Sequence, residues 1–174
     1  MENKVIIDKI RDNLGLTKYH KIGPNQKREV YYGKSDLVKM VQSNKGSHTD
    51  ANSQKPLIGT YGLGPCIAII GHNPKTKTAF ISHNVEHASP EKINNSLIKN
   101  VGKNNLEIYL VGNNLRKNHE EKLIKYLKSE LINPEIVYKD TKTIPDPKGL
   151  GKSIIIDTRD GKIYSHNGIV DFDF

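Results

Sequence analysis

Three residues of types that cooperate in nucleophilic catalysis lie within one glycine-rich and apolar stretch of the chain. Cys66 is the only cysteine of the protein, and it directly follows a glycine-rich turn. His83 comes seventeen residues later, after an apolar run, a turn and a second strand-like run. Two antiparallel strands of about seven residues, joined by a short turn, would bring His83 back beside Cys66. If the turn before Cys66 is tight, Thr60 can hydrogen-bond the histidine, so the three residues predict a thiol nucleophile, a base and a group that orients the base.

The composition limits the class of protein that could carry this site. The chain has 174 residues, which is enough for one domain with a hydrophobic core and some added structure. A single cysteine excludes an intramolecular disulfide, no apolar run is long enough to span a bilayer, and the first residues do not read as a secretory signal. We therefore expect a cytoplasmic protein, with a secreted effector that lacks a classical signal peptide as the alternative.

The formal net charge of +8 is unevenly distributed. Residues 1–55 hold eleven Lys and Arg against six Asp and Glu, whereas residues 56–174 hold sixteen against thirteen. Most of the excess therefore lies outside the stretch that contains Cys66. A basic surface suits an acidic protein partner. Nucleic-acid binding is not expected, because no basic motif with interleaved aromatic residues is present.

Residues 1–55 are predicted to be an N-terminal basic extension that ends in a polar linker. Apolar residues at helical spacing predict a helix over residues 2–14, and residues 27–32 read as a short strand. Ser35 can cap a second helix over residues 36–42. Residues 43–55 are polar and almost free of large apolar side chains, which is typical of a linker or loop.

Residues 56–174 are predicted to form one domain of strands and helices. After the hairpin that contains Cys66 and His83, the run Ser89-Pro90-Glu91 signals the start of a helix that Gly102 ends. A strand over residues 106–111, a helix over residues 118–131, a strand over residues 135–138 and a closing hairpin over residues 153–165 follow. This order predicts an α/β (α+β) layered sandwich with mixed β-sheets, hairpins and two amphipathic helices on the outside.

The motif around Cys66 resembles that of a known family. The pattern T-x-G-L-G-x-C from Thr60 to Cys66, N-P-x-x-K in the hairpin turn and His83 at the end of the second strand are similar to the CheD family of chemoreceptor glutamine deamidases. The resemblance covers roughly residues 56–166. It implies a CheD-like fold, with Cys66 as nucleophile, His83 as base and Thr60 as the residue that orients it. The implied reaction is hydrolytic deamidation of an accessible glutamine in a protein substrate through a cysteine thioester, without a metal or cofactor.

Two departures from the family pattern concern the substrate more than the chemistry. Pro65 stands where the family usually has serine, and a proline has no backbone N–H to offer to an oxyanion. The oxyanion would then have to be bound by the amide of Cys66 and by other donors. The segments after His83 and after the central strand also differ from the family. We predict that Gly64, Ser82 and Asn84 border the substrate.

Other interpretations of the same residues remain open. A lone cysteine is often a small buried hydrophobe. His72 and His87 are rival bases, although His72 is expected at the solvated turn end of the hairpin. A zinc site formed by Cys66, His83 and His87 would lack a fourth ligand at a suggestive spacing.

Two further functions compete with receptor deamidation. The motif resembles, less closely, the necrotizing-factor type of bacterial toxin, which implies deamidation of a host protein. The resemblance to CheD also implies docking to a chemotaxis phosphatase, so a non-catalytic binding partner is the third interpretation.

Overall fold

The computed structural model of the chain describes residues 18–21, 29–32, 37–113, 116–142, 151–166 and 170–171. The described part contains two α-helices and twelve β-strands in three sheets. The elements, in chain order, are β1 Lys18–Lys21, β2 Glu29–Tyr32, β3 Val38–Val41, β4 Gly46–Asp50, β5 Leu57–Leu63, β6 Ile67–Asn73, β7 Thr78–Asn84, α2 Pro90–Val101, β8 Glu107–Gly112, α3 Lys117–Glu130, β9 Glu135–Asp140, β10 Lys152–Asp157, β11 Ile163–His166 and β12 Val170–Asp171.

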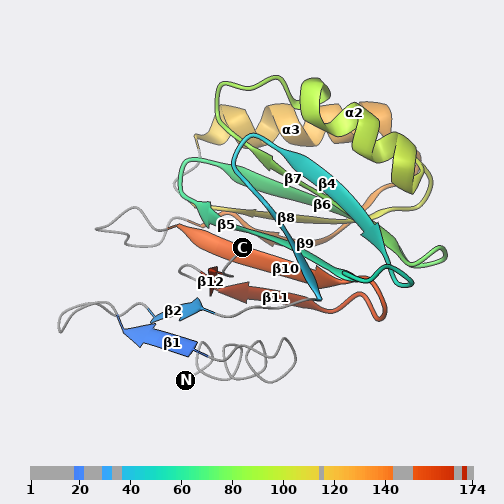
Figure 1. The fold of residues 1–174 in the computed structure, drawn as a ribbon. Helices are drawn as coiled ribbons and strands as arrows, with labels where there is room; N and C mark the ends of the chain where they lie inside the picture. The colour runs from blue at the N-terminus through green and yellow to red at the C-terminus, as the bar shows by residue number, and fades with distance from the viewer. Residues whose placement is uncertain are drawn as a thin grey trace.

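Three layers make up the main body of the fold. A five-stranded sheet in the order β4-β7-β6-β8-β9 lies between the two helices and a four-stranded sheet in the order β11-β10-β5-β3 (Figure 1). Both sheets combine parallel and antiparallel pairs, since β8–β9 and β3–β5 are parallel and most of the other pairs are antiparallel. Strands β1, β2 and β12 form a separate three-stranded sheet. The predicted α+β class with two helices and mixed sheets is confirmed for the described residues.

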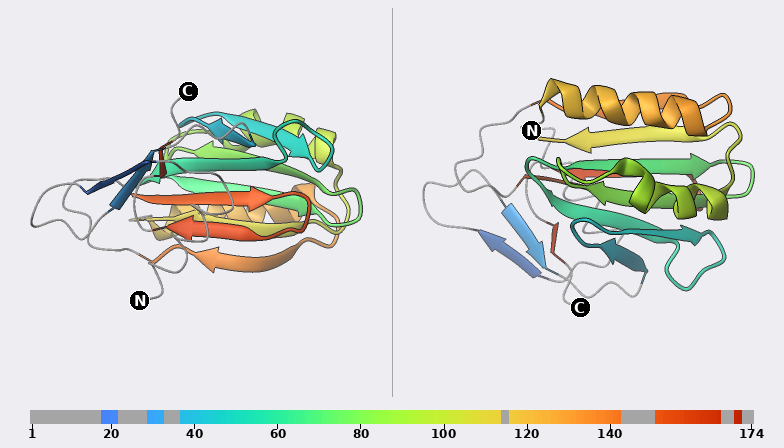
Figure 2. Two further views of the ribbon diagram at one scale, coloured as in Figure 1. Left: turned by 60° about the horizontal axis from the view of Figure 1, so that its bottom comes forward. Right: turned by 90° about the horizontal axis from the view of Figure 1, so that it is seen from above.

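Two hydrophobic clusters hold the layers together, one on each face of the five-stranded sheet. Successive side chains of β6 belong to alternate clusters. Ile67 and Ile69 pack under the helices, whereas Ala68 and Ile70 face the four-stranded sheet. A strand covered on both faces should be apolar throughout, and β6 is buried along nearly its whole length. The view from above shows α2 and α3 lying across one face of this sheet (Figure 2).

The central hairpin forms where the sequence predicts it. Strand β6 pairs antiparallel with β7 from Ile67 opposite Asn84 to Asn73 opposite Thr78. The side-chain oxygen of Asn73 accepts hydrogen bonds from two backbone N–H groups of the connecting turn, which is the usual way that asparagine fixes a turn. In the strand itself, Gly71 leaves room for Phe80, because a Cβ at position 71 would lie 2.2 Å from the Phe80 ring.

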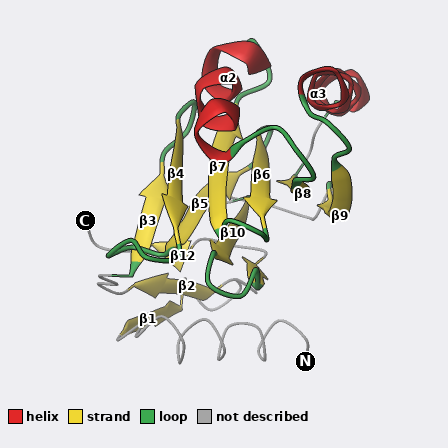
Figure 3. Ribbon diagram, turned by 90° about the vertical axis from the view of Figure 1, so that its right-hand side faces the viewer, coloured by secondary structure: helices red, strands yellow, loops and turns green. Residues whose placement is uncertain are grey.

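Both helices also occupy their predicted positions. Helix α2 begins at Pro90 and ends before Gly102, which has a φ of 95°. Helix α3 begins at Lys117 and bears Leu123, Tyr126 and Leu127 on its buried side. Arg116 occupies the N-cap position of α3, and its side chain makes no capping hydrogen bond. Figure 3 shows both helices on the side of the five-stranded sheet that faces away from β10.

The predictions for residues 36–55 are wrong. The expected helix over residues 36–42 is strand β3, which pairs in parallel with β5, and the expected linker contains strand β4, which pairs with β7. A seven-residue window cannot separate helix from strand by periodicity alone, and here sheet pairing decides the outcome. Because β3 and β4 belong to the two main sheets, the predicted domain boundary at residue 55 is also wrong. The predicted helix over residues 2–14 lies outside the described residues.

In the described part of the chain, neither helix is long and apolar enough to cross a membrane.

Candidate active site

The hairpin places Cys66 and His83 on the same face of the five-stranded sheet. Ala68 lies directly opposite His83 in the β6–β7 pair. Cys66 precedes Ala68 by two residues and packs in the same cluster, on the face that meets the four-stranded sheet. Cys66 is therefore the diagonal neighbour of His83 across the hairpin, a position from which a long or aromatic side chain such as histidine can reach its neighbour. Cys66 and His83 therefore lie at the same end of the hairpin and on the same face of the sheet, as the sequence predicted.

Thr60 reaches His83 from the facing sheet. It lies on β5, is fully buried, and places its Oγ1 2.8 Å from His83 Nδ1. The same Oγ1 lies 2.7 Å from the backbone carbonyl oxygen of Val41, to which it can only donate. A hydroxyl group has one hydrogen, so Thr60 must accept the hydrogen bond from His83. His83 is therefore protonated at Nδ1, and its Nε2 carries a free lone pair.

The lone pair on His83 Nε2 is the feature that a general base requires. Among the described residues, Nε2 is buried and has no hydrogen-bond partner. Burial lowers the pKa of His83 to about 4, so the ring is neutral at pH 7. The structure thus fixes both the tautomer and the protonation state of this side chain. The absence of a partner also means that Cys66 and His83 are not hydrogen-bonded to each other in this state.

The thiol of Cys66 is protonated at neutral pH. Its residue is only 9% exposed, and burial raises the pKa of the thiol. A hydrogen bond from the Ser43 hydroxyl acts in the opposite direction, and the negative charge of Glu86 raises the pKa further. Since the pKa of His83 is lowered while that of Cys66 is raised, the resting pair consists of a thiol and a neutral imidazole. A preformed thiolate–imidazolium pair would need both shifts to have the opposite sign.

One short segment, residues 41–45, contacts all three predicted catalytic residues. Val41 accepts the hydrogen bond from Thr60, and Ser43 bonds to Cys66. The backbone N–H of Asn44 donates to the carbonyl of His83 at 2.9 Å, and the N–H of His83 donates to the carbonyl of residue 45 at 2.9 Å. Sequence reasoning missed this segment because residues 36–42 were assigned to a helix and residues 43–55 to a linker. The turn sequence Ser-Asn-Lys-Gly could have suggested a link between two strands.

The three residues predicted to border the substrate lie in different places. Gly64 is buried in the turn before Cys66, where its N–H donates to the carbonyl of Gly62 at 2.9 Å. Ser82 and Asn84 flank His83 in β7, so their side chains point to the opposite face of the sheet, towards α2.

On that face, Ser82 and Asn84 form a closed polar network with Asn94 of α2. Ser82 Oγ donates to Asn94 Oδ1 at 2.5 Å, Asn94 Nδ2 donates to Asn84 Oδ1 at 3.0 Å, and Asn84 Nδ2 donates to Ser82 Oγ at 2.8 Å. All three residues are buried. The structure therefore does not bring Ser82 and Asn84 together with Thr60 and His83, and the network joins the end of β7 to the start of α2 instead.

The turn before Cys66 is supported by β10, which sequence reasoning did not connect with the site. Lys152 pairs with Leu63, and a Cβ at Gly151 would lie 2.4–2.6 Å from the backbone of Leu63 and Gly64. Only glycine, here with a φ of 68°, allows this contact. Lys152 is itself 1% exposed and donates from Nζ to the Asp140 carboxylate at 2.7 Å. No local pattern in the sequence could have indicated these non-local contacts.

Among the described residues, neither rival histidine is hydrogen-bonded to Thr60, Cys66 or His83. His72 was expected to be solvated, but it is 3% exposed, and its Nδ1 lies 2.9 Å from the carboxylate of Glu107 at the other end of β6. That prediction is wrong because the β10–β11 turn covers the histidine, with Gly161 against its ring. His87 is exposed in the loop that leads to α2.

Comparison of the sequence with models of known protein families finds no match, and comparison with curated proteins finds none either. The resemblance to CheD therefore rests on the residues of the motif.

Proposed function

We propose that this protein hydrolyses the side-chain amide of glutamine in a protein substrate, giving glutamate and ammonia. One observation carries the proposal: Thr60 must accept a hydrogen bond from His83 Nδ1, so Nε2 keeps a lone pair, which has no partner among the described residues. His83 lies on the sheet face on which Cys66 packs. A nucleophile, a base and an orienting group are the arrangement that activated thiols use. The CheD-like motif supports glutamine as the substrate and chemoreceptor glutamines as its source.

The proposed reaction proceeds through a thioester. The sulfur of Cys66 bonds to the amide carbon of the glutamine while its proton passes to His83 Nε2. Backbone N–H groups stabilise the resulting oxyanion, and each good donor in such a site contributes about 3–4 kcal/mol. The imidazolium then protonates the amine, the C–N bond breaks, and ammonia leaves. Water attacks the thioester and gives a proton to His83, the C–S bond breaks, and the thiol recovers that proton.

The shifts in pKa bear on the first step of the proposed reaction. A neutral thiol and a neutral imidazole are the resting state, which favours transfer of the proton as the S–C bond forms. The proton acceptor must then already be the correct tautomer when the substrate arrives. The hydrogen bond from His83 to Thr60 meets this requirement without any rearrangement.

A second candidate is a non-catalytic binding protein. The burial of Cys66 and its raised pKa favour this interpretation, because they also describe an inert core thiol. Replacement of Cys66 separates the two functions, since binding survives it and deamidation does not.

Mass spectrometry of candidate substrates tests the proposal. Purified chemoreceptor cytoplasmic fragments and a panel of other glutamine-bearing proteins are incubated with the parent protein or with Cys66→Ala. Conversion of an amide to a carboxylate adds about 1 Da at a single glutamine, and we expect it only with the parent protein. Equal conversion by Cys66→Ala, or no conversion of any protein in the panel, would contradict the proposal.

A further inference from the structure

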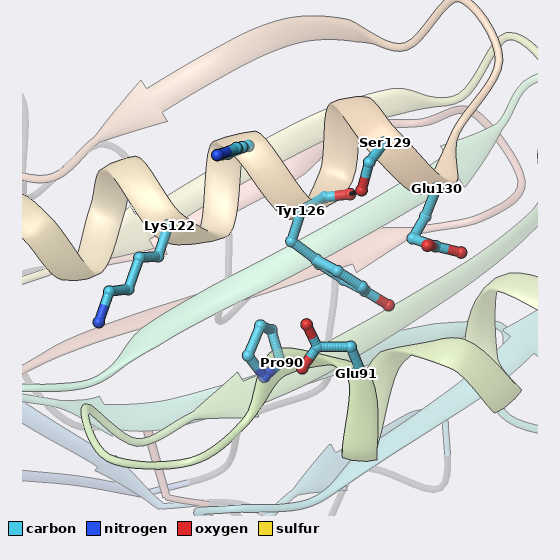
Figure 4. Close-up of a pocket in the computed structure, with 7 residues that line it drawn as sticks. Pro90, Glu91, Lys122, Tyr126, Ser129 and Glu130 are labelled. Carbon is cyan, nitrogen blue, oxygen red and sulfur yellow. Dashed lines mark hydrogen bonds between the residues drawn. The ribbon is translucent and has the colours of Figure 1, made fainter.

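A trough runs between the two helices on the outer side of the fold. One cavity of about 410 Å³ is lined by the loop after β7 and the first turns of α3, and a second of about 360 Å³ continues it along α3. The two cavities share Pro90 and Lys122, so they form one depression, which we call the α2–α3 trough. Figure 4 shows Lys122, Tyr126 and Glu130 on α3 opposite Pro90 and Glu91 at the start of α2.

The trough begins at the end of the sheet that carries Cys66. Strand β7 ends just after His83 and leads through residues 85–89 into the trough wall, while β8 ends at Gly112, opposite Ile67, and leads into α3. His119 of α3 ties these parts together, because its Nδ1 lies 3.0 Å from the carbonyl oxygen of Glu86. A chain segment bound in the trough therefore lies beside the loop that borders the candidate active site.

The unpaired charges along α3 are positive. Within the described residues, each carboxylate of α3 has a cationic partner, since Glu120 pairs with Lys139, Glu121 with Lys117 and Glu130 with Lys103. Glu86 at the end of the trough pairs with Arg116 at 2.8 Å. By contrast, Lys122 and Lys125 line the trough and have no carboxylate partner in the described part of the chain.

Two other features of the trough bear on its charge. The N-terminal ends of α2 and α3 both open into it, and their partial positive charge favours anions. Glu91 is the one carboxylate of the trough without a cationic partner among the described residues, and it accepts a hydrogen bond from Ser89. Because Glu86 and Glu130 are paired with cations, one carboxylate without such a partner faces two lysines and two helix ends, and this environment attracts carboxylates on a flexible chain.

We infer that the α2–α3 trough binds an acidic segment of the protein substrate and so presents a nearby glutamine to Cys66. This inference rests on the proposed function and names the chemistry of the segment that accompanies the glutamine. Lys122 and Lys125 pair with its carboxylates, and the apolar surfaces of Pro90 and Tyr126 contact its aliphatic groups. Nucleic acid fits less well, because the nearby Arg116 is already paired with a carboxylate and so is not free to bind a phosphate through both of its N–H groups.

The test measures binding separately from catalysis. Fluorescence anisotropy follows a labelled peptide of Glu, Ala and Gln residues at low salt, a peptide with Gln in place of Glu, and an oligonucleotide of equal charge. The full-length proteins are the parent, Cys66→Ala, Lys122→Glu/Lys125→Glu, and Lys75→Glu/Lys77→Glu as the matched control. The control lysines are exposed in the β6–β7 turn, at the opposite end of the hairpin from Cys66.

We expect the acidic peptide to bind the parent, Cys66→Ala and the control variant with the same affinity, and the trough variant at least tenfold more weakly. Unaltered binding by Cys66→Ala would uphold the trough even if no deamidation were ever detected. The inference is overturned if the neutral peptide or the oligonucleotide binds the parent as tightly as the acidic peptide. It is equally overturned if the acidic peptide does not bind, or if the control variant loses as much affinity as the trough variant.

Discussion

Replacement of Thr60 by valine tests the hydrogen bond that sets the tautomer of His83. The two side chains have similar shapes, so the substitution removes the hydroxyl and leaves the packing of a fully buried site nearly unchanged. It leaves the Nδ1–H of His83 and the carbonyl of Val41 without their partner. The ring is then free to carry its proton on Nε2, where it cannot act as a base.

The size of the effect on stability follows from these two groups. Each buried polar group that loses its partner costs about 1–3 kcal/mol. The added methyl group of valine returns about 0.8 kcal/mol. We therefore expect Thr60→Val to lower the free energy of unfolding by about 1–5 kcal/mol, and the melting temperature by about 2–4 °C for each kcal/mol lost. Urea unfolding at pH 7 measures the first quantity, and thermal unfolding measures the second.

Thr60→Ser is the matched control, because it keeps the hydroxyl and loses only a methyl group, at a cost of about 1 kcal/mol. The nitrogen chemical shifts of the His83 ring report the tautomer directly. We expect protonated Nδ1 in the parent and in Thr60→Ser, and a mixture of tautomers in Thr60→Val. Equal stability of parent and valine variant, or an unchanged tautomer in the valine variant, would refute the reasoning.

Three further predictions concern acid sensitivity and the support of the turn before the candidate nucleophile. Because burial lowers the His83 pKa from an unfolded value of about 6.5 to about 4, the unfolded state takes up a proton that the folded state does not. The stability that His83 contributes is therefore present above pH 6.5 and is lost as the pH falls to 4, by about 3 kcal/mol in all. Urea unfolding at pH 7 and pH 4.5 measures this loss, and His83→Gln should not show it. Gly151→Ala forces a Cβ to within 2.6 Å of the preceding turn, whereas Gly62→Ala meets open space at a similar φ. Gly62→Ala should thus cost only about 1–2 kcal/mol of backbone strain, and Gly151→Ala clearly more, in urea unfolding; equal losses would contradict the contact. Lys152→Ala should lower the free energy of unfolding by about 2–4 kcal/mol, and Lys152→Met should lower it less, because methionine refills the space. An alanine variant as stable as the parent would show that the buried ion pair with Asp140 does not stabilise the fold.

The sequence predicted those parts of the fold that depend on local signals. The hairpin of β6 and β7 has a turn fixed by Asn73, and α2 has a proline at its first position and a glycine after its last. The motif of Thr60 and His83 also led to a hydrogen bond that the structure contains. Each of these features depends on residues whose types restrict the backbone or the chemistry at one place.

The remaining features depend on pairing between distant strands. Val38 and Val41 fit a helix as well as a strand, and only the partner strand β5 decides between them. The support of the turn before Cys66 by Lys152 likewise follows from sheet order. The orientation of Ser82, by contrast, was predictable from the sequence. Successive side chains of a strand point to opposite faces, so a residue next to His83 has to face the helices.

The central claim is that Cys66 attacks an acyl carbon and that His83 serves as the base, and p-nitrophenyl acetate tests it without knowledge of the natural substrate. Attack on the ester releases coloured nitrophenolate and leaves an acetyl group on Cys66, which intact-protein and peptide mass spectrometry locate. We expect the parent protein to become acetylated at Cys66 and to turn over, because His83 activates the water that removes the acetyl group. His83→Gln should remain acetylated or react much more slowly, and Cys66→Ala should release no nitrophenolate above background. A parent protein that is never acetylated at Cys66, or a His83→Gln variant that turns over as fast as the parent, would contradict the account.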